Sequence, residues 1–176
     1  MFYAILYGAA GPKVASTLGI PESYGKEALD AFWAANPGTA ALKVNLERYW
    51  ESTGQKKYLP AIDGRILMTR KKSALLNTIF QSCGGIVMDY AGVFMDKWLG
   101  GLHWDEFRRP YYIYKGYVVR RIGYFHDELE YECEEPIAEE ISKMIEHAIA
   151  TAGKYLKLQV PLAGEGKVGK NWKETH

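Results

Sequence analysis

The segment that most constrains the fold runs from Tyr124 to Tyr131, where an apolar stretch enters a His-Asp-Glu turn and an alternating stretch leaves it. Alternation with a period of two is typical of a half-buried strand. Asp127 would then share one face with the apolar residues Leu129, Tyr131 and Cys133, and the glutamates would lie on the other. A carboxylate at the head of an apolar row is costly unless a cation compensates its charge. The segment therefore predicts a metal ion or a basic partner at a hairpin, and the alternative is an acidic turn without chemistry.

The size and the charge pattern favour one core and two surfaces of opposite sign. The 176 residues are 48% hydrophobic, which is enough for one ordinary core. Six basic residues and only one acid, Asp63, lie between Lys56 and Lys72, whereas the segment from Asp127 to Glu146 is strongly acidic. This distribution suits a protein that meets a polyanion on one surface and metal or solvent on another. Ordinary solvated faces are the alternative.

The two cysteines, Cys83 and Cys133, form neither a disulfide framework nor a zinc-binding spacing. They indicate a reducing cytosol, so we expect a cytoplasmic protein. The N-terminal apolar run breaks at Gly8, and no later segment is long and uncharged enough to span a bilayer. We therefore expect neither a signal peptide nor a membrane partner.

The first half of the chain predicts helices around one hairpin. Residues 1–8 have the pattern of the last two turns of a helix, with Tyr3 and Tyr7 on one face, and so short a helix needs packing to be stable. Helices over 25–36 and 39–52 are expected to form an antiparallel pair. The Asp63-Gly64 dipeptide between two apolar runs predicts a hairpin that carries the basic residues.

A long helix is predicted from Ser73 to Trp98, apolar nearly all round and therefore buried. Asn77 and Gln81 interrupt it on one stripe, and the Gly84-Gly85 pair follows on the same side, where a bare backbone permits close approach. Buried amides need partners. They would bond to neighbouring backbone or reach the groove edge of a base pair, and the residues alone do not separate these alternatives.

The second half predicts strands over 110–115 and 117–125, a helix from Pro136 to about Lys154, and a final strand over 155–162. Gly164 to Lys170 has the spacing of a phosphate-binding P-loop. Asn171 replaces the required Ser or Thr, and only five residues follow it, so we expect no helix N-terminus and no phosphate site there.

Together these segments resemble the C-terminal portion of a family A DNA polymerase, of the DNA polymerase I superfamily, and most of all the replicative enzymes of T-odd tailed phages. The similarity covers essentially the whole chain, and each motif gains weight because all occur in the family order. Four segments carry it: Tyr3 to Gly8, similar to the end of the fingers helix; Asp63-Gly64-Arg65 with Asn77 and Gln81, similar to the palm segment that meets the minor groove; His126-Asp127-Glu128, similar to motif C; and Gly166 to His176, similar to the family's C-terminal ending.

The resemblance implies an α+β fold with helical C-terminal fingers over 1–55 and, over 56–176, half of a palm sheet with the motif C hairpin, packed by long helices. It implies that Asp127 is one of two aspartates holding a pair of Mg²⁺ ions, with Glu128 adjacent and His126 near the primer end. Tyr3 and Tyr7 would contact the incoming dNTP and the templating base. Residues implied to bind the primer-template DNA are Arg65, Asn77, Gln81, His126 and His176.

The family residues that would lie before Met1 include the other metal-binding aspartate and the Arg and Lys that hold the triphosphate. The resemblance therefore implies the C-terminal subunit of a split DNA polymerase, a phage protein in a bacterial host, that shares its Mg²⁺ ions with a separate N-terminal subunit. The runner-up is a non-catalytic module, either a primer-template DNA-binding protein or a truncated polymerase remnant. A third alternative treats the aromatics and amides as core and the acidic hairpin as plain surface.

Overall fold

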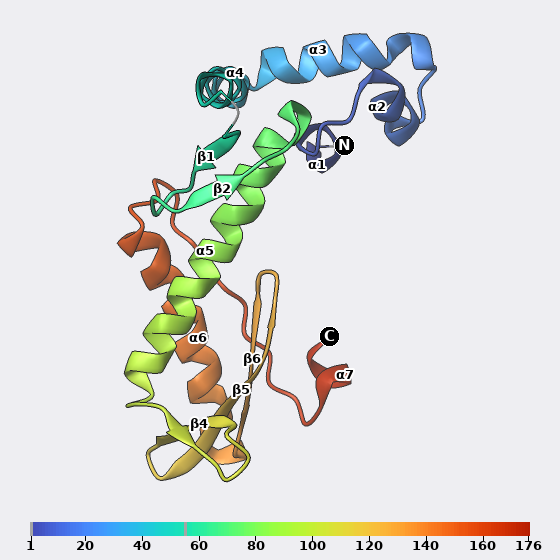
Figure 1. The fold of residues 1–176 in the computed structure, drawn as a ribbon. Coiled ribbons are helices and arrows are strands. Elements are labelled where there is room, and N and C mark those ends of the chain that lie inside the picture. The colour runs from blue at the N-terminus through green and yellow to red at the C-terminus, as the bar shows by residue number, and fades with distance from the viewer. Residues whose placement is uncertain (1, 55) are drawn as a thin grey trace. The chain divides into compact units, whose positions relative to one another are not determined.

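The structure, a computed structural model, describes residues 2–54 and 56–176. The chain forms two compact units, residues 1–83 and 84–176, which divide within the long helix α5, Leu75–Trp98 (Figure 1). None of the helices in the described ranges is both long and apolar enough to cross a membrane. The elements before α5 are α1 (Phe2–Leu6), α2 (Gly11–Leu18), the 3-10 turn η1 (Glu22–Tyr24), α3 (Gly25–Ala35), α4 (Pro37–Ser52), β1 (Tyr58–Pro60), β2 (Ile66–Met68) and η2 (Lys72–Ala74).

Two glycines shape the start of the first unit. Gly8 ends α1 in the left-handed region, at φ 86°, which is accessible to glycine without a Cβ penalty. Gly25 lets α3 approach α2 closely, because a Cβ there would lie 2.1 Å from the carbonyl oxygen of Gly11. A small core of Ile5, Val14 and Phe32 forms around this approach. The short α1 is thus stabilised by packing, as its length predicts.

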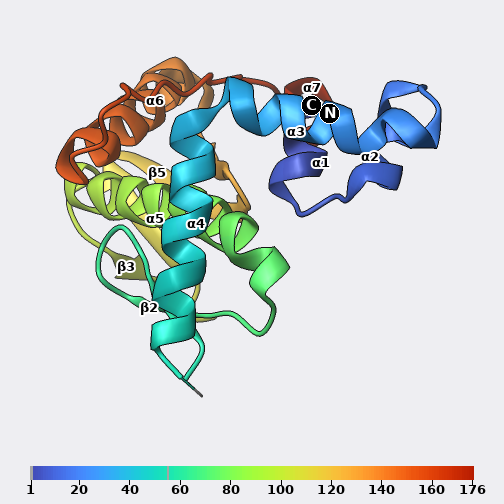
Figure 2. The ribbon, with the colours of Figure 1, turned by 90° about the horizontal axis from the view of Figure 1, so that it is seen from above.

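The two central helices do not form the predicted antiparallel pair. Both views show α3 and α4 crossing steeply after Asn36, rather than lying side by side (Figures 1 and 2). The reason is that α4 packs through Trp50 against β1 and α5, where Leu59 and Leu75 complete a second core cluster. The aromatic residues of the two helices therefore serve different cores.

The hairpin predicted around Asp63-Gly64 is present, with β1 and β2 antiparallel and Leu59 opposite Leu67. Part of its positive charge is neutralised within the first unit. Lys72 forms ion pairs with two glutamates of α4, at 2.7 Å and 3.3 Å, and Lys57 lies over the Trp50 ring at 4.0 Å. Lys56, Arg70 and Lys71 are further exposed cations of this basic segment.

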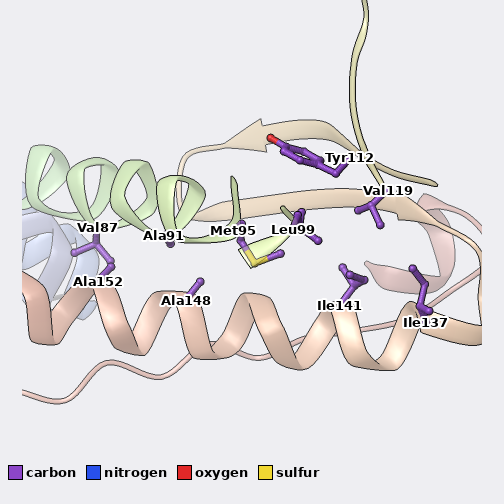
Figure 3. Close-up of a cluster of buried hydrophobic side chains, with 10 residues drawn as sticks. All are labelled: Val87, Ala91, Met95, Leu99, Tyr112, Val119, Ile137, Ile141, Ala148 and Ala152. Atoms are coloured by element: carbon purple, nitrogen blue, oxygen red, sulfur yellow. The ribbon is translucent and has the colours of Figure 1, made fainter. Parts of the chain in front are cut away.

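The second unit packs α5 and α6 against one antiparallel sheet of order β3-β4-β5-β6. Along α5 and at the residue after its end, the buried residues Val87, Ala91, Met95 and Leu99 follow a four-residue spacing and meet α6 (Figure 3). This stripe covers only part of the helix, so Val93 stays 48% exposed and the prediction of all-round burial is wrong. The elements are β3 (His103–Trp104), β4 (Pro110–Tyr114), β5 (Tyr117–Phe125), β6 (Glu128–Cys133), η3 (Glu135–Ile137), α6 (Ala138–Tyr155) and α7 (Trp172–Thr175).

The predicted strand over 155–162 is wrong. Helix α6 continues to Tyr155, and residues 156–162 form turns and irregular chain that return along the helix. Leu158 and Leu162 pack against the core of the second unit without pairing to the sheet. A Cβ on Gly153 would lie 2.9 Å from the Leu162 side chain, so this glycine permits the close return. An apolar run that covers a helix has the same composition as a strand, and the pattern did not distinguish them.

The glycine-rich tail lies against α6. The amide of Gly166 donates to Glu146 at 2.9 Å, and a Cβ on that glycine would lie 2.0 Å from the Ser142 hydroxyl. The glycines thus allow close packing and do not form a phosphate loop. A four-residue helix, α7, does begin at Trp172, so the expectation of no helix after Asn171 is wrong.

Candidate functional site

The His-Asp turn lies at the tip of the β5–β6 hairpin. Phe125 pairs with Glu128, so His126 and Asp127 form a two-residue connection, and His126 takes the left-handed region at φ 55°. His126 and Asp127 are both exposed. Asp127 thus belongs to the turn and not to the strand, and water can solvate its charge. The prediction of a metal ion from the cost of a carboxylate in an apolar row therefore does not apply to Asp127.

The strand that leaves the turn has the predicted alternation. Leu129, Tyr131 and Cys133 pack against the core of the second unit. Burial raises the pKa of Tyr131 to about 12, which keeps this hydroxyl neutral under the hairpin. The tip is therefore supported by a partly buried row of side chains that follows the exposed carboxylate of Asp127.

Two glutamates on the opposite face of β6 meet a histidine from the tail. The Nε2 atom of His176 lies 2.7 Å from Glu128 Oε1 and 3.6 Å from Glu130 Oε1. One ligand atom from each of these three residues falls within 4.8 Å of the others. The carbonyl of Trp172 and then the carboxylate of Glu128 raise the pKa of His176 above its usual range. Carboxylate and imidazole are ligand types for divalent metals, but here the histidine already partners both carboxylates.

The histidine is held by its own short helix. The His176 and Trp172 rings stack at 3.8 Å with an interplanar angle of 8°, and Trp172 makes an edge contact with Phe125 at 5.7 Å. Nδ1 of His176 lies 3.1 Å from the Trp172 carbonyl oxygen. The tail thereby contacts both members of the pair that closes the turn, Phe125 and Glu128.

In the first unit, the structure brings the two tyrosines and the amide stripe together. Tyr3 and Tyr7 are 72% and 51% exposed, with ring centroids 6.3 Å apart. The Gln81 amide nitrogen donates to the Tyr7 hydroxyl at 2.6 Å. The Asn77 amide oxygen is buried and has no hydrogen-bond partner among the described residues. The stripe thus meets α1 through Gln81, and Asn77 retains an unused acceptor.

Arg65 is placed on the β1–β2 hairpin. Its Nε lies 2.9 Å from the Asp63 carboxylate, and its backbone amide bonds to the same side chain at 3.2 Å. These contacts lower the pKa of Asp63 against the effect of its partial burial. The guanidinium is exposed and oriented by the turn. The hairpin thus holds the Arg65 side chain in an orientation set by Asp63.

Three residues of the hairpin and tail cluster were missed by the sequence reasoning: Phe125, Glu130 and Trp172. The spacings that could have found them are local. Trp172 and His176 are four residues apart, and Glu128 and Glu130 are two apart on one face of a strand. Nothing in the sequence indicates that the two pairs meet.

Comparison with known proteins assigns this arrangement to a family. The profile of DNA polymerase family A matches residues 1–174. The chain belongs to DNA polymerase family A. This confirms the predicted family, and the chain is part of a family A polymerase domain.

Two phage relatives show how much of a family A polymerase the chain spans. It is 30% identical over 181 residues to the DNA-directed DNA polymerase of Escherichia phage Phieco32, covering 99% of this chain and 27% of the relative. It is 27% identical over 190 residues to that of Escherichia phage T7, covering 99% of this chain and 25% of the relative. The chain thus spans about a quarter of the length of these curated relatives.

A solved family A structure has the same fold. The chain resembles the POL domain of Pol1 from M. smegmatis, in a complex with DNA primer-template and dNTP, with a TM-score of 0.65 at 18% identity. The match covers 86% of this chain and 26% of that one. The likeness confirms the predicted α+β class, with long helices and antiparallel sheets.

Proposed function

We propose that the chain is the C-terminal subunit of a split DNA-directed DNA polymerase. One observation supports the polymerase part of the proposal: the family profile matches the chain over residues 1–174. A separate N-terminal subunit would add the second metal-binding aspartate, the Arg and Lys for the triphosphate, and the thumb. The residues 1–55 would then complete the fingers, and 56–176 the palm.

Asp127 would bind the metal ions at the hairpin tip. Its exposed carboxylate suits Mg²⁺, which keeps several waters and takes one or two carboxylates. When bound, a pair of Mg²⁺ ions activates the primer 3′ oxygen and stabilises the leaving pyrophosphate. Glu128 lies beside Asp127 on β6, and the strained backbone of His126 would direct its ring to the primer end. The hairpin thus supplies one half of a metal site.

The first unit would contact the nucleotide and the DNA. Tyr3 and Tyr7 present exposed rings on which a base or sugar can stack. Gln81, which fixes the Tyr7 hydroxyl, and Asn77, with its unused oxygen, would test minor-groove geometry without reading sequence. Arg65 would contact a phosphate. The Tyr7–Gln81 bond would couple nucleotide contact to minor-groove contact.

Primer extension tests the proposal. The chain is expressed with an affinity tag in its native host, purified alone and with its co-purifying polypeptides, and assayed with a primer-template, dNTPs and Mg²⁺. We expect no extension by the chain alone and restored extension when a polypeptide carrying the missing motifs is added. Extension by the chain alone would refute the need for a partner. DNA binding without extension in every combination would favour the non-catalytic primer-template binding module.

A further inference from the structure

We propose that α7 is a latch, and that His176 is a positioning residue for Glu128 and does not contact DNA. The inference rests on the proposed function for its catalytic consequence, but the latch itself stands on contacts within the second unit. These contacts occupy both nitrogens of the His176 ring and both ends of the pair that closes the turn.

The His176 ring has no free polar atom to offer to a phosphate. Nε2 faces Glu128 Oε1 at 2.7 Å, and Nδ1 faces the Trp172 carbonyl and the Thr175 hydroxyl, each at 3.1 Å. The Glu128 carboxylate and the Trp172 carbonyl are acceptors, so a ring that donates from both nitrogens satisfies both. With 31% of its side chain exposed, the histidine is used inside the cluster.

The ring also lies near a second carboxylate, that of Glu130. Glu130 Oε1 is buried without a hydrogen bond among the described residues, and its side chain is 15% exposed. His176 Nε2 lies 3.6 Å from this oxygen. An unpaired carboxylate in this position would repel the neighbouring Glu128. The histidine therefore lets two glutamates lie two residues apart on one face of β6.

The stacked rings of Trp172 and His176 contact both strands at the turn. Phe125 on β5 and Glu128 on β6 are register partners, so their side chains share a face. Trp172 contacts the first and His176 contacts the second. Because α7 holds the two rings in a stack, it fixes the two strand ends against each other. The residues between them, His126 and Asp127, are thereby held at the tip.

The tail anchors the latch. The amide of Lys170 donates to a Glu174 carboxylate oxygen at 2.8 Å, and the Asn171 side chain donates to the other at 3.0 Å. A Cβ on Gly169 would lie 2.7 Å from the Glu174 Cβ, so glycine permits this turn. Together with the Gly166 bond to α6, these contacts bring the helix back to the hairpin.

Two variants of His176 separate its two contacts. His176→Phe keeps a flat ring for stacking on Trp172 and loses both donors. His176→Gln keeps a donor for Glu128 and loses the ring. Amide hydrogen exchange of residues 124–131 is measured on the full chain, with the amides of α6 as an internal reference. We expect His176→Phe to accelerate exchange of the hairpin amides about tenfold, the effect of losing one charged hydrogen bond. His176→Gln, which loses the stack on Trp172 but keeps a donor for Glu128, should accelerate exchange by less than His176→Phe.

A second readout distinguishes positioning from DNA contact. In the complemented polymerase, His176→Phe should lower kcat about tenfold and leave the KM for dNTP and the Kd for primer-template within about twofold. Partial rescue of kcat by His176→Gln supports the latch. A weaker Kd with a smaller salt dependence, at unchanged kcat, would overturn it in favour of a phosphate contact.

The hydrogen-exchange and kinetic experiments also test the latch and the proposed function separately. If no complemented enzyme extends a primer, the proposed function fails, and hydrogen exchange still decides whether α7 holds the hairpin. Unchanged exchange of residues 124–131 in His176→Phe would refute the latch even in an active polymerase.

Discussion

The replacement Tyr112→Phe tests how the sheet under the hairpin is attached to α5. Tyr112 is 2% exposed, and its hydroxyl donates to Asp96 Oδ1 at 2.5 Å. Phenylalanine keeps the ring and its packing, so the change removes only the hydrogen bond. A bond to a charged acceptor contributes about 1.5–3 kcal/mol. Asp96 retains Arg121 at 3.8 Å and 42% side-chain exposure, so we expect a loss near the lower end of that range.

The same residue gives the prediction a pH dependence. Burial and then the Asp96 carboxylate raise the pKa of Tyr112 above its ordinary value of 10.0. A group whose pKa is raised in the folded state contributes its full stability below the unfolded pKa and loses it as the pH rises. The parent chain should therefore lose about 1.4 kcal/mol from this tyrosine between pH 9 and pH 11. Tyr112→Phe removes that loss.

Denaturant unfolding at pH 8, 9, 10 and 11 measures both effects. The free-energy difference between parent and variant should shrink above pH 10. The neighbouring Tyr111→Phe is the control, because Tyr111 stacks on His103 and phenylalanine keeps that ring contact. A constant difference at all four pH values, or an equal loss in the control, would refute the assignment of the bond.

Three further substitutions test the packing. Gly25→Ala should destabilise the first unit by about 1–3 kcal/mol, because its Cβ would contact the Gly11 carbonyl. Gly38→Ala is the control, because a Cβ there meets nothing within 4 Å. Equal melting temperatures of these two variants would contradict the prediction. Met95→Ala should cost about 2–5 kcal/mol by opening a cavity at a fully buried site, and a loss below 1 kcal/mol in denaturant unfolding would show a looser core. Gly166→Ala should release the tail from α6, seen as faster proteolysis after residue 162, and an unchanged cleavage pattern would argue against the docked path.

The sequence predicted well those features that local chemistry determines. The Asp63-Gly64 hairpin, the presence of a turn at His126-Asp127-Glu128 and the helices that end near glycine all follow from short-range preferences, whereas the place of Asp127 in that turn and not on the strand was not predicted. The strand predicted over 155–162 failed because an apolar run has the same pattern on a sheet or along a helix. The prediction that α3 and α4 form an antiparallel pair failed for a related reason, since Trp50 belongs to a core that forms with β1 and α5.

In the candidate site, too, local patterns predicted some residues, and the contacts between distant segments were not predicted. Asp127 and the Tyr7–Gln81 pair carry motif signals, and the structure brings Tyr7 and Gln81 together. The meeting of His176 with Glu128 joins residues 48 positions apart and depends on how the tail returns along α6. No local pattern encodes that return, so the latch became visible only with the fold.

The most direct test of the central claim is single-turnover nucleotide addition by the complemented polymerase carrying Asp127→Asn, with Asp30→Asn as the matched control on the exposed face of α3. Removing a metal-binding carboxylate should slow the chemical step by at least about 10³-fold at saturating dNTP and DNA. The control should stay within about twofold of the parent enzyme. A rate for Asp127→Asn that matches the control would contradict the assignment of the hairpin tip as half of the metal site.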